Sequence, residues 1–204
     1  MENATMPTKT NLIKLQNTLA LSKQGSELLE KKRQILIRQM QKQEEEMKKR
    51  NEEAVQLFKE GYQLLENANM EIGIETMMQL ADGMQEENGL DIKYLTIMGV
   101  DIPSIVYEKK KMKIHYGLYS TTISVDKAIL KFNEIKEILI VLAQIQNTVE
   151  RLKESINKVQ KRSNSLKNIQ IPKYQEDIRQ IQNALEEKER EEFARLKVIK
   201  KRKM

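Results

Sequence analysis

Cysteine and tryptophan are absent from this chain of 204 residues, and turn-forming and aromatic residues are scarce. It contains 7 Gly and 3 Pro, and only 4% of its residues are aromatic. Without cysteine, the chain cannot form disulfides or thiolate metal sites, and a reducing compartment is permitted rather than established. So few turn formers among many Glu, Lys, Gln and Leu favour long, uninterrupted helices over an ordinary globular core.

Long hydrophobic runs are also missing. The longest apolar run covers residues 138–143, far short of the ~20 residues that a membrane-spanning helix needs. Residues 1–9 lack the apolar region of a signal peptide. We therefore expect a protein without direct membrane insertion, which is soluble or is held at a membrane only by its partners.

Residues that carry chemistry are equally scarce. His115 is the single histidine, and one histidine without cysteine cannot build a zinc site or a Cys–His pair. Neither a Walker-type phosphate loop nor a Rossmann fingerprint occurs. Acidic runs such as residues 44–46 alternate with lysine and arginine, which is typical of a solvated helix face. The sequence predicts no catalytic residue, metal site or cofactor, and an enzyme is the least favoured interpretation.

The first half of the chain follows a coiled-coil pattern. Thr8, after Pro7, is a plausible N-cap for a helix of about 57 residues, which would be about 85 Å long. Steps of three and four residues connect sixteen seam positions, most of them Leu, Met, Ala or Gly. The positions are Leu12, Leu15, Leu19, Ser22, Ser26, Leu29, Arg33, Leu36, Met40, Gln43, Met47, Arg50, Ala54, Leu57, Gly61 and Leu64.

Helical character continues less regularly beyond this seam. It includes Met70, Met77, Met78 and Met84, which we expect to pack in the core, although methionine also suits an adaptable binding surface. The strong turn signal Asn88-Gly89 ends the helical stretch.

Residues 91–120 change to β-type composition. Two β-favouring runs, around Tyr94 and Val106, are separated by Gly99 and Pro103, which we expect to mark a bend. The pattern predicts a short hairpin.

A second helical arm follows. The Ser/Thr cluster at residues 120–124 predicts its start, and Pro172 is expected to interrupt or kink it near Ile171. The seam positions are Ile138, Leu142, Ile145, Val149, Leu152, Ile156, Val159, Ser163 and Leu166, followed by Tyr174, Ile178, Ile181 and Leu185.

Together these patterns predict an all-α dominated fold, a long antiparallel two-helix coiled coil with a small β-hairpin head. We expect an N-terminal arm over residues 1–86, the head over 87–121 and a C-terminal arm over 122–204. If the arms are equal, the numbers of facing residues sum to about 208. In that register Leu36 lies near Pro172 and Leu12 lies near Leu196.

The net charge of +6 is concentrated at one end. Residues 190–204 hold seven basic and two acidic residues, which favours a nearby acidic surface, nucleic acid or anionic lipid, or simply a solvated helix end. A second basic cluster, Lys109, Lys110, Lys111 and Lys113, suits partner contact in the head or, as we prefer, a soluble exposed edge. The small residues Ser22, Gly25 and Ser26 suggest a thin section of the coiled coil.

Several stretches resemble one known family, in order and spacing, across nearly the whole chain. They are Pro7-Thr8-Lys9 through Leu19, residues 25–33, residues 98–103 and 116–121, Arg162–Leu166 with Ile171-Pro172, and residues 187–200. These stretches resemble the D subunit of the vacuolar/archaeal-type (V-type/A-type) rotary ATPases, the central rotor stalk family.

The resemblance implies a non-catalytic rotor subunit that couples ATP synthesis or hydrolysis to proton or sodium translocation. Both arms would enter the hexamer of catalytic and regulatory subunits. The head would face the membrane, contact the small F subunit of the central stalk and dock on the funnel-shaped subunit above the ion-carrying ring. The protein would then be peripheral, on the cytoplasmic side of a membrane.

The implied contact residues lie near the tip and in the head. The candidates are Leu12, Leu15, Leu19, Gly25, Phe193, Arg195, Leu196, Ile199 and Lys200 at the tip, and Lys109, Lys110, Lys111 and Lys113 in the head. The main alternative is a free-standing coiled-coil adaptor or scaffold, which explains the seam but not the matched arms around a β head. Nucleic-acid binding is less favoured, because aromatic residues are few and no known binding module occurs.

Overall fold

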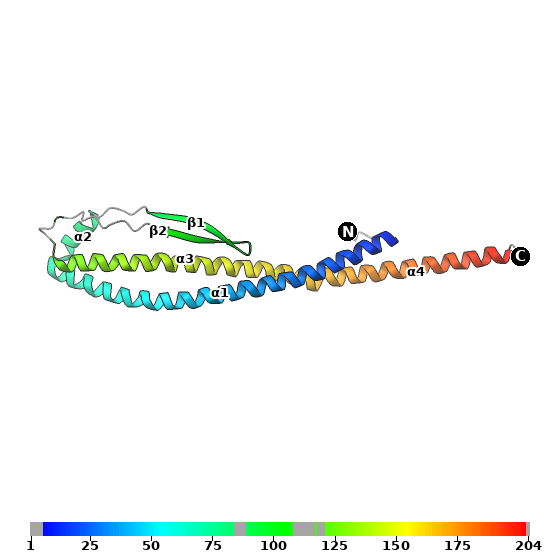
Figure 1. Ribbon diagram of the computed structural model, residues 1–204, viewed down its shortest axis with the longest axis horizontal. Helices are drawn as coiled ribbons and strands as arrows, with labels where there is room; N and C mark the ends of the chain where they lie inside the picture. The colour runs from blue at the N-terminus through cyan, green and yellow to red at the C-terminus, as the bar shows by residue number, and fades with distance from the viewer. Residues whose placement is uncertain (1–5, 84–88, 108–116, 118–120, 203–204) are drawn as a thin grey trace. The chain divides into compact units, whose positions relative to one another are not determined.

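The computed structural model describes residues 6–83, 89–107, 117 and 121–202 (Figure 1). The elements, in chain order, are α1 (Lys9–Ile72), α2 (Ile74–Asp82), β1 (Leu90–Ile97), β2 (Val100–Tyr107), α3 (Ile123–Ser165), the π-helical turn η1 (Leu166–Gln170) and α4 (Ile171–Arg202). Long helices with one two-stranded antiparallel sheet confirm the predicted fold class. The chain divides into two compact units, Met1–Ile35 with Ile156–Met204, and Leu36–Ser155.

Helix α1 begins and packs as its sequence predicts. The backbone N–H of Asn11 donates to Thr8 Oγ1 at 3.2 Å, so Thr8 is the N-cap. Of the sixteen seam positions, only Arg50 is exposed, and the others are buried or half-buried. The three-and-four spacing therefore identified the packed face of a helix of 64 residues.

Helical structure continues past residue 72, as predicted, but as a separate short helix. Gly73 adopts a φ of 81°, in the left-handed region, and separates α1 from the nine-residue helix α2. Met77 is half-buried, but Met70 and Met78 are 72% and 65% exposed and do not serve as core residues. Met84 and Asn88 lie outside the described residues.

In the unit Leu36–Ser155, α1 and α3 run antiparallel, side by side (Figure 1). The Lys131 ammonium lies 2.8 Å from Glu60, and Ser124 Oγ donates to Glu71 at 2.6 Å. The buried residues of α1 in this stretch are Leu36 and the small residues Ala54, Gly61 and Ala68, which are seven residues apart. Gly61 packs against Ile135, one of the larger buried residues of α3, which also include Val125, Ile145 and Leu152.

In the other unit, the start of α1 pairs with α4. Lys9 Nζ lies 2.9 Å from Glu189 Oε1. In the same unit, Val159 and Ser163 of α3 and Ile178 and Ile181 of α4 are buried.

The register predicted from equal arms is wrong. Facing numbers that sum to 208 would place Lys9 opposite Ile199, but its partner is Glu189, ten residues earlier. In the unit Leu36–Ser155 the difference is similar, because Glu71 meets Ser124 where Glu137 was expected. The arms are unequal, since α4 continues to Arg202 beyond the partner of the first residue of α1.

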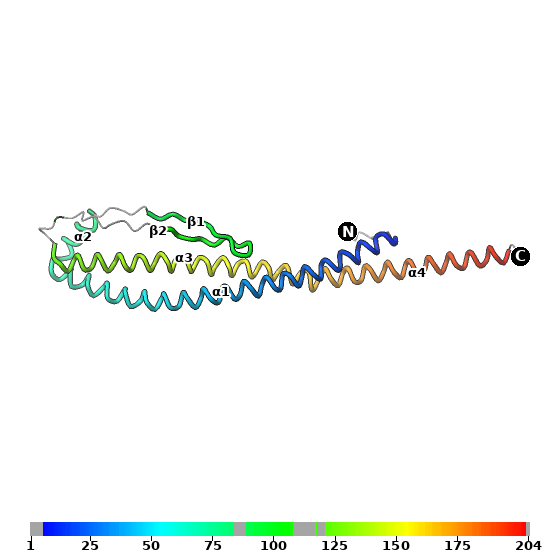
Figure 2. The backbone as a smooth tube through the Cα atoms, viewed as in Figure 1, coloured from blue at the N-terminus to red at the C-terminus, as the bar shows by residue number. Residues whose placement is uncertain are grey.

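The interruption predicted near Ile171 takes the form of a π-helical turn just before Pro172, and the helix does not end there. The helix passes through residues 165–171 without a break (Figure 2) by way of η1, in which the Ile171 N–H donates to the Leu166 carbonyl, five residues back. Such a π turn inserts one extra residue into a helix. The seam accordingly steps by five, from Leu166 to Ile171, before its three-and-four spacing resumes.

The hairpin forms where the β-type composition predicts it. Ile97 pairs with Val100 across the two-residue turn Met98-Gly99, whose φ angles of 52° and 75° define a type I′ turn. Pro103 does not mark the bend, because it lies within β2 opposite Tyr94. A two-stranded sheet has only edge strands, where proline is tolerated.

Candidate functional site

The predicted contact residues near the termini fall into two groups. Leu12, Leu15, Leu19 and Gly25 of α1 are half-buried, and the three leucines occupy seam positions. On α4 the candidates are exposed, with Phe193 at 72%, Leu196 at 59% and Ile199 at 52%, and with Arg195 and Lys200 exposed as well. The leucines of α1 therefore serve packing within the chain, whereas the side chains of α4 are free for contact with another molecule.

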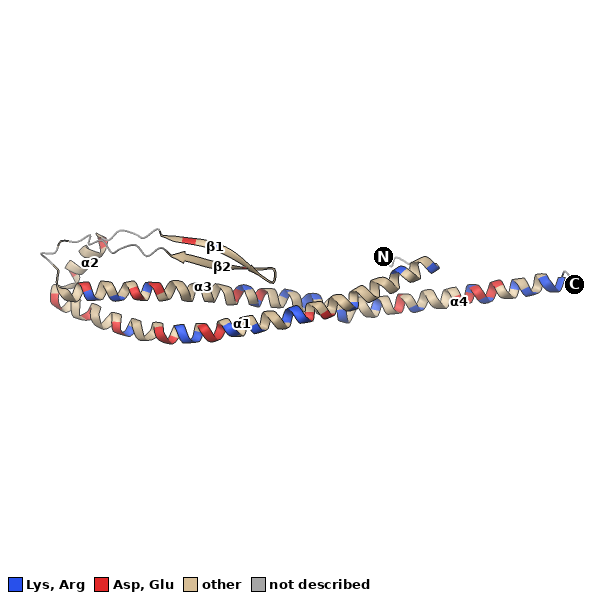
Figure 3. Cartoon of the chain, in the orientation of Figure 1, with Lys and Arg blue, Asp and Glu red and all other residues tan. Residues whose placement is uncertain are grey.

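The exposed end of α4 is apolar and basic at once. Every residue from 186 to 202 is exposed, and Lys and Arg gather towards the C-terminal end of the helix (Figure 3). Arg190 and Arg195 pair with acids four residues earlier, at 3.7 and 3.9 Å, which contributes only about 0.3–0.5 kcal/mol per exposed pair. The basic residues of the last turn also complement the negative end of the helix dipole.

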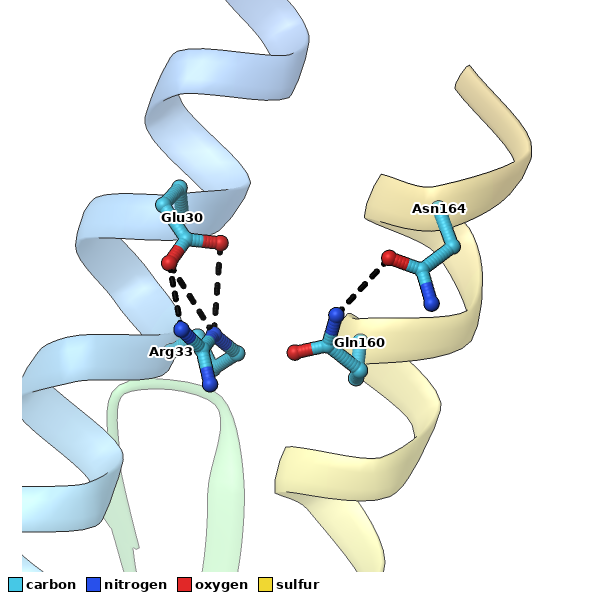
Figure 4. Close-up of polar contacts among 4 residues, drawn as sticks. All are labelled: Glu30, Arg33, Gln160 and Asn164. Atoms are coloured by element: carbon cyan, nitrogen blue, oxygen red, sulfur yellow. Dashed lines mark hydrogen bonds and ion pairs between the residues drawn. The ribbon is translucent and has the colours of Figure 1, made fainter. Parts of the chain in front are cut away.

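The seam has a polar section in the same unit (Figure 4). Arg33 Nε donates to Glu30 Oε1 at 3.2 Å, and Gln160 Nε2 donates to Asn164 Oδ1 at 2.8 Å. The hydrogen bond from Arg33 lowers the pKa of Glu30, with a smaller contribution from the charge of Lys167. Both hydrogen-bonded pairs lie within their own helices, so neither of them ties one helix to the other.

The hairpin is attached to α3 by polar side chains that the sequence analysis missed. Arg151 Nη1 donates to the Asp101 carbonyl at 3.1 Å, and its guanidinium lies 5.2 Å from the centre of the Tyr94 ring. The Ile105 N–H donates to Gln144 Oε1 at 3.0 Å. These partners are 39 and 50 residues apart in sequence, and no local pattern distinguishes Gln144 or Arg151 from other polar residues of α3.

A groove at the junction of α1 and α2 is a further feature without a sequence signal. It has a volume of about 510 Å³ and is lined by Tyr62, Leu65, Glu66, Asn69, Met70 and Ile74. Its apolar side chains are largely exposed, with Met70 at 72% and Ile74 at 67%. Asn69 Oδ1 is buried there without a hydrogen-bond partner in the described part of the chain.

The remaining predicted site residues lie outside the described ranges. These are Lys109, Lys110, Lys111 and Lys113. The single histidine, His115, for which no site role was predicted, also lies outside them. Within the described ranges, no three His, Cys, Asp or Glu residues are grouped to hold a metal ion. No helix in those ranges has the length and apolarity to cross a bilayer.

Paired helices with small and apolar seam residues and a charged exterior define a coiled-coil protein that carries a β-hairpin along one helix. Residues 11–201 match the family described as the ATP synthase D subunit. The V-type ATP synthase D subunit of Thermotoga neapolitana is 41% identical over 196 residues, which are 96% of this chain and 97% of that protein. The A-type ATP synthase D subunit of Pyrococcus horikoshii is 34% identical over 95% of this chain and 92% of its own length.

The chain belongs to the D-subunit family of ATP synthases. The function predicted from the sequence is thereby confirmed at the level of the family, as a central-stalk subunit of a V/A-type rotary ATPase that is itself non-catalytic. As an ATP synthase component, it has other subunits of a membrane-associated complex as partners. A free-standing adaptor is not favoured.

Proposed function

We propose that this chain is the shaft that transmits rotation between a nucleotide-hydrolysing hexamer and an ion-carrying ring. The tip, made by the start of α1 and the end of α4, lies within the hexamer of catalytic and regulatory subunits. The head lies towards the membrane, on its cytoplasmic side. Residues 1–86 and 122–204 act as the two arms and 87–121 as the head. The observation that carries the proposal is family membership over nearly the whole chain.

Two properties of the helices suit them to this role. Transmission of torque requires stiffness, which uninterrupted hydrogen-bonded helices supply, and α1 alone is 64 residues long. Rotation within a ring of subunits also requires a surface that no partner grips strongly. The exposed charges of α1 and α4 supply such a surface, because exposed ion pairs contribute only about 0–1 kcal/mol each.

The end of α4 is the proposed bearing. Phe193, Leu196 and Ile199 are exposed apolar side chains on a strongly charged helix, and aromatic and aliphatic groups of this kind commonly anchor protein contacts. Arg195 and Lys200 lie beside them in the sequence and suit contact with acidic residues of the surrounding hexamer. Leu12, Leu15 and Leu19 support the bearing from α1 by holding the seam together, and Gly25 marks a thin section.

The head is proposed to contact the small F subunit of the central stalk and the funnel-shaped subunit above the ring. The groove between α1 and α2, in the arm that precedes the head in the sequence, adds exposed apolar side chains, including Met70 and Ile74. Lys109, Lys110, Lys111 and Lys113 supply positive charge within the head. A peripheral position at the membrane follows from these protein contacts.

Truncation after Glu189 tests the bearing. It removes the exposed end of α4 but keeps Glu189, the partner of Lys9. In the reconstituted complex we expect ATP-driven ion pumping to fall severalfold, while the truncated chain still binds the stalk partners through its head. Unchanged pumping by the truncated chain would contradict the bearing role.

A matched pair of variants separates apolar from charged contacts at the tip. The triple variant Phe193→Ser, Leu196→Ser, Ile199→Ser removes the apolar side chains and leaves the charges. The double variant Arg195→Gln, Lys200→Gln does the reverse. We expect the first to impair coupling between ATP hydrolysis and pumping more than the second, because buried apolar anchors contribute more to protein contacts than charges at the rim.

A further inference from the structure

The two outer edges of the hairpin differ. The turn at Met98-Gly99 makes Ile97 and Val100 a hydrogen-bonded pair, and such pairs alternate along an antiparallel ladder. The main-chain groups of Asp101, Pro103 and Ile105 in β2 therefore point away from β1. The Asp101 carbonyl and the Ile105 N–H both bond to side chains of α3, which agrees with this outward orientation.

The outer edge of β2 is closed. Its Asp101 carbonyl accepts from Arg151, and its Ile105 N–H donates to Gln144, both on α3. Between them stands Pro103, which has no N–H to donate. An added strand would have to displace two side chains and would still miss one hydrogen bond.

Among the residues that the structure describes, nothing bonds to the outer edge of β1. The register places Thr96, Tyr94 and Ile92 opposite Asp101, Pro103 and Ile105, so their main-chain groups point to the free side. Their amides have no hydrogen-bond partner in the described part of the chain. All eight residues of β1 are exposed.

This edge also lacks the usual protection against pairing. Natural edge strands carry prolines, bulges or several lysines, but β1 has no proline, pairs without a bulge over eight residues and contains one lysine, Lys93. Its apolar side chains are exposed on both faces of the strand, with Ile92 at 54% and Leu95 at 60%.

We propose that an extended segment of another subunit of the ATPase adds to β1 as a third strand, held by main-chain hydrogen bonds to Ile92, Tyr94 and Thr96. This rests on the proposed function, because it requires a partner within the same complex. Strand addition of this kind obtains its affinity from the main chain and its selectivity from alternate side chains.

The area of the edge favours such a partner over a second copy of the chain. Stable independent interfaces bury about 1,200–2,000 Å², which one strand of eight residues does not supply. The added segment must therefore belong to a protein that other contacts already hold in place. Opposite charges face each other favourably across strands, so the segment should place an acid opposite Lys93 and a base opposite Asp91.

Residue-resolved amide hydrogen exchange tests the proposal, on the free chain and on the assembled complex. In the free chain the inward amides of Lys93 and Leu95 should be protected, and those of Ile92, Tyr94 and Thr96 should exchange rapidly. On assembly the outward amides should slow at least tenfold. Outward amides that still exchange rapidly in the assembled complex would overturn the proposal, as would protection in the free chain that rises with its concentration, which would indicate a second copy.

Two substitutions at Ile92 separate the contribution of its main-chain N–H from that of its side chain. Ile92→Pro removes an outward N–H without removing a bond of the β1–β2 ladder, and Ile92→Ala removes the side chain but keeps the N–H. We expect Ile92→Pro to abolish the added protection at Tyr94 on assembly and Ile92→Ala to keep it. Equal loss in both variants would overturn a main-chain contact.

The same preparations distinguish this proposal from the proposed function. If the wild-type chain does not assemble with ATPase subunits, the proposed function fails. If it assembles and its outward amides stay unprotected, only strand addition fails.

Discussion

A Cβ atom placed on Gly61 would lie 2.6 Å from Ile135 Cδ1, closer than side chains approach one another. Gly61 is the middle member of the small, buried series Ala54, Gly61 and Ala68 on α1. Its missing side chain is what lets α3 bring the buried Ile135 against the backbone of α1. Glycine is unfavourable within a helix, and this contact is the physical reason for its presence there.

Gly61→Leu should lower the free energy of unfolding by about 1–3 kcal/mol, because overpacking a tight interface forces side chains and backbone to shift. Urea denaturation measures the effect. Gly25→Ala is the matched control, since no atom lies within 4 Å of a Cβ there, and it should stabilise the chain by up to about 1 kcal/mol. A Gly61→Leu variant as stable as the wild type would contradict this account of the seam.

Gly73→Ala should destabilise the junction of α1 and α2. The φ of 81° at this residue costs an L-amino acid about 1–2 kcal/mol, although the space around it is open. Gly83, at the end of α2, has a φ of −78°, so Gly83→Ala should change stability by less than about 0.5 kcal/mol. Comparing the urea midpoints of the two variants checks the prediction, which fails if both lose the same stability.

The π turn should depend on the seam and not on Pro172 alone. Because the seam steps by five from Leu166 to Ile171, Pro172→Ala should keep the extra residue. Deletion of Asn168 restores a four-residue step but places Pro172 within a regular helix, at a cost of about 3 kcal/mol. The deletion combined with Pro172→Ala should recover most of that loss. Failure of the combined variant to recover stability in thermal unfolding would show that the π turn has another cause.

The stability of the unit that contains Glu60 and Lys131 should decrease at acidic pH. The hydrogen bond and charge of Lys131 lower the pKa of Glu60, so this pair stabilises the fold above the ordinary pKa of glutamate. Its contribution is lost as the pH falls through the lower pKa of the folded state. The wild type should therefore lose more stability between about pH 5 and 3 than Glu60→Gln does.

The control for this pH dependence is Glu75→Gln on α2, because Glu75 has no ion pair in the described part of the chain. That variant should follow the wild-type profile. The hydrogen bond that Lys131 donates to Glu60 also raises the pKa of Lys131, so the same contribution should disappear again at strongly alkaline pH. Parallel acid profiles for Glu60→Gln and the wild type would contradict a stabilising pair.

The packed faces of the helices could be predicted from the sequence, but the register could not. Seam residues such as Leu36 and Leu152 follow from spacing alone, because a helix face repeats every three to four residues. Which residues face each other depends on where each arm ends, and the position of Glu189 beside Lys9 carries no local signal. The five-residue step before Ile171 was visible in the sequence and would have predicted the π turn.

The turn and strands of the hairpin could be predicted from the sequence, but the contacts of its edges could not. Its turn and strands are local, and β-type residues on either side of Gly99 specify them. The closed and open edges depend on Arg151 and Gln144, which reach β2 from α3 across 50 and 39 residues of sequence. Local patterns contain nothing about such contacts.

Rotation of this chain during ATP hydrolysis tests the central claim most directly. The chain has no cysteine, so Leu130→Cys, at a position that is 56% exposed on α3, provides a single thiol for a bead while the complex is immobilised through its hexamer. The account predicts that the bead turns in one direction as long as ATP is hydrolysed. A stationary bead on complexes that hydrolyse ATP and pump ions would contradict it.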